Sequence, residues 1–340
     1  MTDTRSLLQE RLINIVSRFP NRRLLVVGDL IADQFVYGAI SRVSREAPVF
    51  ILRHEQTETV PGGAANCALN LSTLGAKVHL IGAVGDDVAG RALIGKLAGA
   101  GVDCSAVAVV PEHQTTTKVR ILAGQLHSTR QQVIRLDYDG NSGDKPELLD
   151  RFRESVIQLS QSSNAVIISD YNYGVADAEL VKAVRAIPAD HSIPVLVDSR
   201  FRLSDFPGFT SATPNEDELE QLLGKRLTSV SELESAAQLM REQLGYRALL
   251  VTRGSHGMAL FEEGLAPFHI DAVGAHEPVD VTGAGDTVIA TYALAIASGA
   301  SFSDAAHLAN YAGGLVVMKR GTATVTHKEL EHSISHSAQT

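Results

Sequence analysis

The stretch Asp280-Val-Thr-Gly-Ala-Gly-Asp-Thr287, which continues as VIATYALAIASG (288–299), carries the strongest signal in the sequence. Its second part is small and apolar throughout, which predicts a buried helix. Gly283 and Gly285 leave backbone N–H groups open at the first turn of that helix, where the helix dipole adds partial positive charge. Together these groups predict an anion site, and a phosphate chain is its natural occupant.

Asp286 lies beside this predicted anion site, where its carboxylate could accept the proton of an attacking hydroxyl. We expect the helix N-terminus to lower the pKa of Asp286, so that the carboxylate is ionised at neutral pH. A weak base suffices, because phosphoryl transfer depends chiefly on positioning and charge neutralisation. Alone, the segment GAGD is better explained as a capped helix start after a tight turn, and only the accompanying motifs favour the phosphate site.

Short apolar runs alternate with helix-length segments through the rest of the chain. The runs are RRLLVVGD (22–29), KVHLIGAVG (77–85), NAVIISD (164–170), IPVLVDS (193–199) and YRALLVT (246–252). This βαβ pattern predicts an α/β fold, in which a mostly parallel sheet is covered by helices on both faces. Ligands of such sheets bind at the carboxyl ends of the strands, so the polar residues at those ends predict one composite site. These residues are Asp29, Asp170, Asp198 and Thr252.

Two segments, 35–55 and 115–139, break this pattern, because they are rich in β-branched residues with hairpin-like punctuation. We interpret them as a small sheet that stands off the main body as a lid, the alternative being an edge extension of the core sheet. The whole chain, 1–340, is then one domain with this lid. The first twenty residues predict an amphipathic helix, and the tail HSISHSAQT (332–340) is expected to fray.

Composition excludes several classes of protein. The 340 residues carry a formal net charge of −9 without a basic block, which argues against nucleic-acid binding. No stretch is long and apolar enough to span a bilayer. Cys67 and Cys104 have no metal-binding spacing, and we expect two buried thiols in a reducing cytoplasm.

DVTGAGDT is similar to the C-terminal signature of the ribokinase-like, or phosphofructokinase B type, carbohydrate kinases. Further segments resemble that family in chain order: VVGDLIAD (26–33), PGGAAN (61–66), TPNEDE (213–218), VTRGSHG (251–257) and LANYAGG (308–314). The resemblance extends over about residues 22–330. It implies a three-layer α/β sandwich with a β-sheet lid, and ATP with Mg²⁺ as cofactors. It also implies Asp286 as catalytic base, with the backbone of Gly283, Ala284 and Gly285 stabilising the transferred group.

The resemblance also implies roles for individual residues. Those implied for the sugar are Asp33, Gly62, Gly63 and Asn66. Those implied for the nucleotide are Asn215, Glu218, Thr252, Arg253, Gly254, Gly257 and Asn310. Glu218 would meet Mg²⁺ through water, and a monovalent cation, K⁺, would lie near Asp280 and Thr282. Simpler explanations stay open: a turn at Asp33, a turn and helix start at 62–63, a capping box at Asn215 and Glu218, and a surface position for Arg253.

Within the family, four segments resemble the heptose-phosphate kinase domain of the heptose kinase/ADP-heptose synthase proteins. They are YGAISRVSREAPV (37–49), TKVRIL (117–122), QQVIRLDYD (131–139) and SDYNYG (169–174). The resemblance implies phosphorylation of D-glycero-D-manno-heptose 7-phosphate at O1, a step toward lipopolysaccharide. The chain departs from those proteins at Tyr173, where they usually have Lys, and at Asp198-Ser199-Arg200, where they have Asp-Pro-Lys. It has no HxGH-type motif, so we expect a stand-alone kinase.

The lid segments carry four cations, Arg42, Arg45, Lys118 and Arg120. If the sugar already bears a phosphate, we expect some of them, Lys118 and Arg120 foremost, to bind it. A solvated lid face is the alternative for each. The β-rich lid also predicts a homodimer formed through its edge. Two other functions stay open: a kinase for another sugar or a nucleoside, and a non-catalytic nucleotide- or sugar-binding protein.

Overall fold

The alternating apolar runs form one large sheet in the computed structural model, which describes residues 2–124, 130–140, 145–187, 193–274 and 277–336. Its strands are β1 (Arg23–Gly28), β4 (Lys77–Gly85), β5 (Val102–Asp103), β6 (Val107–Val110), β9 (Ala165–Asp170), β10 (Val195–Ser199), β11 (Ser211–Ala212), β12 (Ala248–Thr252), β13 (Met258–Glu262) and β14 (Phe268–Ile270). They follow the order β14-β13-β12-β11-β10-β9-β1-β4-β5, with β6 beside β4. The pairings of β13 are antiparallel and the others are parallel, so the predicted mostly parallel sheet is confirmed.

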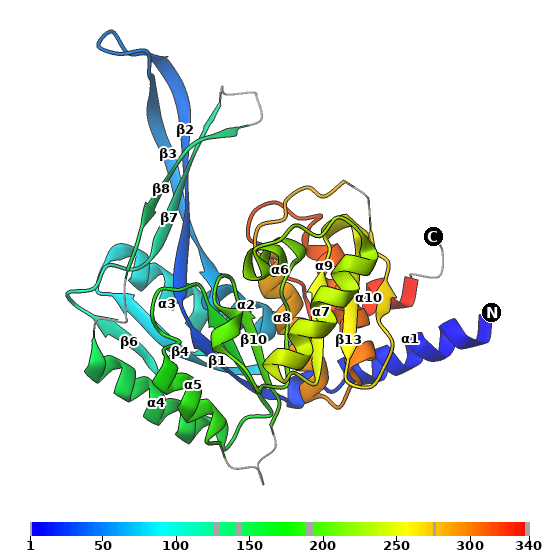
Figure 1. Cartoon of the computed structure of the whole chain (residues 1–340). Helices are drawn as coiled ribbons and strands as arrows, with labels where there is room; N and C mark the ends of the chain where they lie inside the picture. Colours follow the sequence, from blue (N-terminus) through cyan, green and yellow to red (C-terminus); the bar gives the residue numbers. More distant parts are fainter. Residues whose placement is uncertain (1, 125–129, 141–144, 188–192, 275–276, 337–340) are drawn as a thin grey trace.

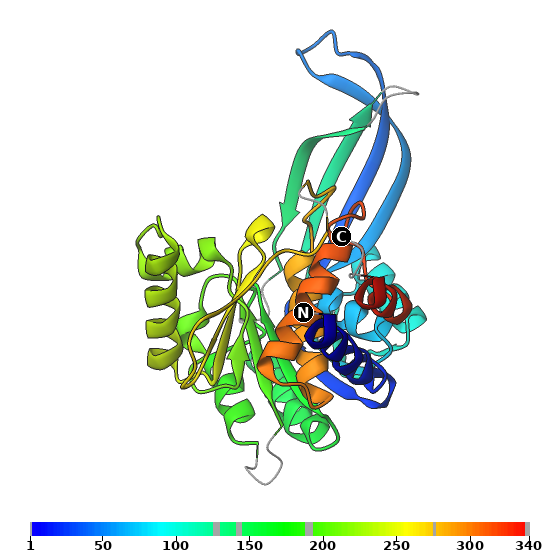
Figure 2. The same ribbon diagram turned by 90° about the vertical axis from the view of Figure 1, so that its right-hand side faces the viewer.

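Helices cover both faces of this sheet, because the side chains of each strand alternate between two apolar cores. In β1, Leu24 and Val26 belong to one core, and Leu25 and Val27 to the other. The first face carries α1 (Thr2–Val16), α2 (Ala64–Thr73), α3 (Val88–Gly99), α8 (Ala284–Ala297), α9 (Phe302–Val316) and α10 (His327–His336). The second carries α4 (Pro146–Ser160), α5 (Ala178–Arg185), α6 (Glu216–Leu223) and α7 (Val230–Leu244). Figure 2 shows the resulting three layers, which confirm the predicted sandwich.

A second sheet of four strands projects from this body, as Figure 1 shows. Its order is β3 (Phe50–Gly63), β2 (Leu30–Val43), β7 (Thr117–Gly124) and β8 (Gln131–Tyr138). The lid is therefore a separate sheet, and an edge extension of the core sheet is the wrong interpretation. The strands β7 and β8 lie within the predicted range 115–139, whereas β2 and β3 reach closer to the core than the predicted range 35–55, because β2 starts two residues after β1 ends. Asp33 consequently lies within a strand, and the turn considered for it is wrong.

The two ends of the chain pack together through α1 and α10 on the first face of the sheet. The predicted N-terminal helix is confirmed. The expectation of a frayed tail is wrong as far as His336, because Leu330 and Ile334 lie one helical turn apart and are both fully buried. Cys67 is buried as expected, whereas Cys104 is only half-buried at the edge of the core. None of the helices in the described ranges has the length and hydropathy needed to cross a bilayer.

Candidate active site

The carboxyl ends of the core strands meet the base of the lid in a cavity of about 410 Å³. Asp170, Asp198 and Thr252 line this cavity from β9, β10 and β12, as predicted for strand ends. Asp29 does not join them. It is buried beneath the 171–175 loop, where its carboxylate accepts backbone hydrogen bonds. The predicted composite site is thus formed by three of the four strand-end residues.

The start of α8 forms one wall of the cavity, and its two glycines have different roles. Gly283 is the N-cap, with a φ of 76°, and a Cβ there would lie 2.5 Å from Asn66 Nδ2. A Cβ on Gly285 would meet no protein atom within 4 Å, so this position opens into the cavity. The N–H of Ala284 donates to the carbonyl of Val281 at 3.2 Å, so it is not free for an anion as predicted. The N–H groups of Gly283 and Gly285 have no partner within the ranges that the structure covers.

Asp286 is in the first turn of α8, and only 3% of it is exposed. Its Oδ1 accepts the hydroxyl of Tyr171 at 2.9 Å, and its Oδ2 accepts Asn66 Nδ2 at 2.8 Å. Burial raises the pKa of Asp286 to about 6, against the two donated hydrogen bonds, which lower it. The predicted lowering of this pKa is therefore wrong, because desolvation outweighs the hydrogen bonds that Asn66 and Tyr171 donate. With a pKa of about 6, the carboxylate is still mostly ionised at neutral pH.

Asp33 and Arg120 lie on the neighbouring lid strands β2 and β7 and form a salt bridge, although the register pairs Asp33 with Lys118. Both line the cavity, together with Lys118, whose ammonium lies 5.6 Å from the centre of the Tyr171 ring. Burial lowers the pKa of Lys118. A Cβ on Gly62 would lie 2.4 Å from Asp33 Oδ2, so this glycine makes room for the carboxylate.

The remaining residues predicted to bind the sugar divide into two groups. Gly63 has a φ of 57°, which favours glycine, and lines the cavity beside Asp33. Asn66 reaches the site through its bond to Asp286. Arg42 and Arg45 are exposed at the far end of the β2–β3 hairpin, where the alternative of a solvated lid face applies.

Asn215 and Glu218 form the capping box that opens α6, with hydrogen bonds of 2.8 and 3.0 Å. The cap leaves both residues at the cavity wall, beside Asp198. Burial raises the pKa of Glu218, and burial together with the charge of Glu218 raises that of Asp198. Two carboxylates that repel each other beside an amide oxygen are the donors that Mg²⁺ prefers. The residues present therefore fit a magnesium ion at this wall.

A second cavity, of about 210 Å³, adjoins the first and shares with it Thr252, Val281, Ala284 and Gly285. Gly254, Gly257 and Asn310 line it, as predicted for the nucleotide, along with apolar side chains such as Met258 and Val288. A Cβ on Gly257 would lie 2.0 Å from the carbonyl oxygen of Ile270, so only glycine fits there. Asn310 Nδ2 donates to the carbonyl of Asp271 at 2.7 Å, which fixes the side chain in the wall.

Two predicted residues have partners that the sequence did not indicate. Arg253 lines neither cavity, because its guanidinium pairs with Glu216 at 2.7 Å, so its assignment to the nucleotide site is not supported. The carboxylate of Asp280 accepts the N–H groups of Thr282 and Gly321, each at 2.9 Å. These bonds outweigh burial and lower the pKa of Asp280, which therefore anchors the turn before α8. Thr282 lines the larger cavity.

Tyr171 is the main residue of the site that sequence reasoning missed. Its signals were its position directly after Asp170, at the end of β9, and its place in the segment SDYNYG (169–174). Arg200 also lines the cavity, two residues after Asp198.

Comparisons with known proteins identify the family and the fold. The family model described as pfkB family carbohydrate kinase matches residues 21–329. Two curated relatives, each named bifunctional protein HldE, come from Edwardsiella ictaluri and Erwinia tasmaniensis, and both are 42% identical to this chain. The alignments cover 95% and 93% of this chain but 65% and 64% of the relatives, so the chain spans a little under two thirds of their length.

Two solved structures have the same fold. Arabidopsis thaliana ribokinase complexed with ribose and ATP has a TM-score of 0.74 at 24% identity, over 92% of this chain and 98% of that one. Escherichia coli phosphofructokinase-2 in complex with potassium has a TM-score of 0.75 at 19% identity, over 94% of this chain and 100% of that one. At these identities the likeness concerns the fold alone.

Proposed function

This chain belongs to the pfkB family of carbohydrate kinases, and from that premise we propose that it transfers the γ-phosphoryl group of ATP to a phosphorylated sugar. The proposed acceptor is O1 of D-glycero-D-manno-heptose 7-phosphate. The observation that carries the proposal is the position of Asp286. Its buried carboxylate lies where the apolar second cavity meets a cavity lined by lid cations. A nucleotide in the former and a sugar phosphate in the latter would meet at the start of α8.

The proposed reaction follows from these positions. The acceptor oxygen attacks the γ-phosphorus, its proton passes to Asp286, and the bond from the γ-phosphorus to the β,γ-bridging oxygen breaks, releasing ADP. The N–H groups of Gly283 and Gly285 would stabilise the charge on the transferred group. When bound, Mg²⁺ neutralises charge on the ATP phosphates, and Glu218, with Asp198 beside it, would hold the ion. The lid would exclude water and so prevent ATP hydrolysis.

The charges of the lid support a phosphorylated acceptor. Arg120 and Lys118 lie on β7 at the cavity, and Arg120 forms a salt bridge with Asp33. A phosphate group on the sugar would attract both cations, because guanidinium and ammonium groups bind phosphate strongly. Release of Arg120 would leave the Asp33 carboxylate free to accept hydroxyl groups of the sugar. A neutral sugar would supply hydroxyl groups for Asp33 but no phosphate for Lys118 and Arg120.

A homodimer is the proposed assembly, and the lid is its proposed interface. Asp33, Lys118 and Arg120 face the cavity, so their neighbours along each strand face the opposite side. That opposite side is apolar on the outer strand, where Ile134 and Leu136 are 50% and 43% exposed. A second copy of the chain would cover these side chains. A monovalent cation near Asp280 and Thr282 also remains our prediction, and omission of K⁺ from the assay tests it.

ATP consumption by the purified protein, measured against a panel of free and phosphorylated sugars, tests the proposal. We expect strong stimulation by the heptose 7-phosphate, with the product identified as the 1,7-bisphosphate by ³¹P NMR. Stimulation by another sugar would keep the reaction and reject the heptose. Nucleotide binding without turnover on any member of the panel would reject the kinase activity in favour of a binding protein.

A further inference from the structure

Tyr171 supplies one of two hydrogen bonds that hold the carboxylate of Asp286 from opposite sides. The tyrosine hydroxyl donates to Oδ1, and Asn66 donates to Oδ2 from α2. The two donors come from different parts of the chain, 115 and 220 residues from Asp286 in sequence. Each oxygen retains a lone pair for the acceptor hydroxyl. The direction of that lone pair therefore depends on where the ring of Tyr171 lies.

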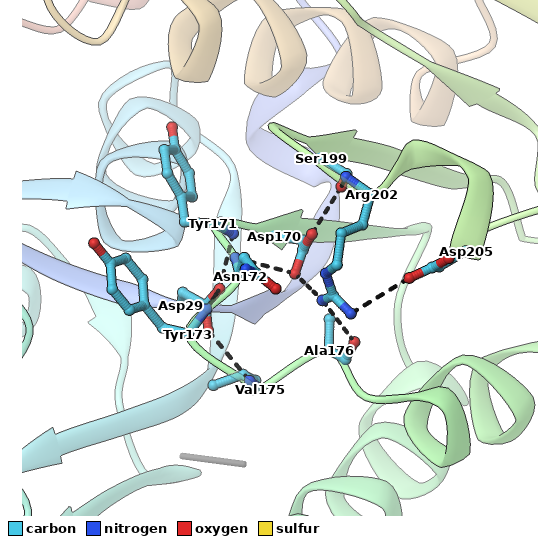
Figure 3. A network of polar contacts seen from close by, with 10 residues as sticks. All are labelled: Asp29, Asp170, Tyr171, Asn172, Tyr173, Val175, Ala176, Ser199, Arg202 and Asp205. Carbon is cyan, nitrogen blue, oxygen red and sulfur yellow. Dashed lines mark hydrogen bonds and ion pairs between the residues drawn. The ribbon is translucent and has the colours of Figure 1, made fainter. Parts of the chain in front are cut away.

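The ring is carried by the 171–175 loop, where one buried carboxylate accepts three backbone N–H groups and Asp170 accepts that of Asn172 at 3.3 Å. Asp29 accepts the N–H groups of Tyr171, Tyr173 and Val175, at 2.8, 3.1 and 3.2 Å. Only 2% of Asp29 is exposed. Figure 3 shows its carboxylate inside the curve of the loop, with dashed lines to three of the loop's residues. Asn172 has a φ of 65°, a left-handed conformation that the loop keeps because these bonds fix its neighbours.

The preceding strand end is anchored separately. Asp170 is fully buried, and it accepts the hydroxyl of Ser199 at 2.7 Å and forms a salt bridge with Arg202. Figure 3 shows this second set of contacts beside the first. The loop therefore starts from a fixed point and curves around another, which leaves its first side chain, Tyr171, little freedom.

We propose that Asp29, acting through the 171–175 loop, positions the hydroxyl of Tyr171 on Asp286 and so orients the base toward the acceptor hydroxyl. This role rests on the proposed phosphoryl transfer. Tyr171 and Asp29 are positioning residues in this scheme, since they act through Asp286.

The electrostatic consequence can be stated from the groups that face Asp286. Asp33 from β2, Lys118 from β7, Asp198 from β10, and Asn66 and Cys67 from α2 surround it, along with Tyr171. The hydrogen bond from Tyr171 lowers the pKa of Asp286. Loss of that bond should raise this pKa, so that the base becomes protonated at a higher pH.

The substitution Tyr171→Phe tests the hydrogen bond, and Tyr173→Phe is its matched control. Tyr173 belongs to the same loop, but its hydroxyl contacts Asp139 at 3.2 Å. For Tyr171→Phe we expect kcat to fall about tenfold, as for one lost hydrogen bond, with the KM of the sugar unchanged. The acid limb of the kcat–pH profile should move to higher pH. Tyr173→Phe should keep the wild-type limb. An unmoved limb for Tyr171→Phe would overturn the proposal.

A double-mutant cycle with Asp29→Asn tests the positioning role. One oxygen of Asp29 accepts two N–H groups and the other accepts one, so an amide must face at least one of these donors with its own NH₂ group. We expect Asp29→Asn to lower kcat about tenfold in the wild type but less than twofold in the Tyr171→Phe background, because coupled residues are non-additive. If the kcat losses of the two single variants multiply in the double variant, Asp29 has a merely structural role and the proposal is rejected.

A readout without turnover separates this inference from the proposed function. The ¹³C resonance of the Asp286 carboxyl, assigned by its loss in Asp286→Asn, can be titrated in the wild type and in Tyr171→Phe. An upward shift of the midpoint in the variant supports the positioning role even if no sugar proves to be a substrate. An unchanged midpoint, with normal turnover of the heptose 7-phosphate, would reject the positioning role and keep the kinase.

Discussion

The start of α8 and the outer strand of the lid are both close to the cavity, yet they are built in opposite ways. Every residue of α8 from 286 to 295 is buried, whereas all eight residues of β8 are exposed. Packing on all sides holds Asp286 in one place, whereas the lid strands are held by the backbone pairing between them. Segments with few buried contacts open most easily. The difference indicates that the helix bearing Asp286 is held more firmly than the outer edge of the lid.

The two regions also differ in charge. The core side of the cavity carries four carboxylates and one cation, and the lid side carries two cations and one carboxylate. The core residues are Asp170, Asp198, Glu218, Asp286 and Arg200, and the lid residues are Lys118, Arg120 and Asp33. Asp198, Glu218 and Asp286 have raised pKa values because they are buried near one another. Buried carboxylates that lie near one another destabilise the folded protein when they are ionised, and they favour the binding of a cation or a proton. The following predictions are ordered from the largest expected effect to the smallest.

Replacement of the base should separate activity from stability most strongly. For Asp286→Asn we expect kcat to fall by about 10³-fold or more, as for the loss of a general base, while ATP binding stays nearly intact. The pKa of this group is raised from 3.8 to about 6, so the folded state favours the proton and loses stability as pH rises through that interval. Removal of the charge should therefore stabilise the protein at pH 7 by up to ~3 kcal/mol.

Steady-state kinetics and thermal unfolding at pH 4 and pH 7 measure these two effects. The wild type and the variant should differ less in stability at pH 4 than at pH 7. Wild-type turnover by Asp286→Asn would show that another group is the base.

The two glycines of α8 should respond differently to alanine. Gly285→Ala points a methyl group into the open cavity, so we expect normal folding with kcat/KM lower by about 100-fold, as for misplaced reactants. Gly283→Ala places a Cβ 2.5 Å from Asn66 Nδ2 at a φ of 76°, so it should also destabilise the fold, by ~1–3 kcal/mol. Urea unfolding with kinetics on both variants tests this. Equal free energies of unfolding for the two variants would contradict the backbone strain assigned to position 283.

Substitution of a lid cation should change binding more than chemistry. For Arg120→Gln we expect the KM of the sugar phosphate to rise by about 10- to 100-fold, as for a lost charged hydrogen bond, with kcat within a few-fold of the wild type. Arg42→Gln is the control, because Arg42 lies on the same sheet but is exposed. A fall in kcat with an unchanged KM would place Arg120 in the chemical step instead.

The two limbs of the pH profile should report the two regions separately. On the acid side kcat should fall as the pH drops through about 6, where Asp286 takes up a proton. On the alkaline side the KM of the sugar phosphate should increase as Lys118 loses its proton. This increase should begin at a pH below the usual pKa of lysine, because burial lowers the pKa of Lys118. Lys118→Arg should abolish the alkaline change only, since arginine stays charged. If both limbs move in Lys118→Arg, the assignment of the acid limb to Asp286 and the alkaline limb to Lys118 is wrong.

The outward face of the lid should affect assembly with little effect on the fold. Leu136→Lys is expected to convert the proposed dimer to a monomer in analytical ultracentrifugation. Its free energy of unfolding per chain, measured on monomers, should change by no more than about 0.5 kcal/mol, as for an exposed position. A wild type that sediments as a monomer would reject the interface.

Several features of this protein could be predicted from the sequence because they depend on neighbouring residues. The apolar runs predicted the core strands, and the family resemblance drawn from the motifs is confirmed. The capping box of Asn215 and Glu218, which their spacing left open as the simpler explanation, is present. Convergence of strand-end residues followed from the parallel order, which brings their carboxyl ends to one edge.

What only the tertiary structure decided depends on contacts between distant residues. The pKa of Asp286 rises because whole elements pack around it, which no local pattern encodes. Arg253 pairs with Glu216 across 37 positions, and Tyr171 reaches Asp286 across 115. The sequence by itself determined the elements and their order, since periodicity and capping act within a few residues, and its motifs singled out Asp286 as the candidate base. The partners and the protonation of that base were set by packing, because desolvation and hydrogen bonding depend on everything within a few ångströms.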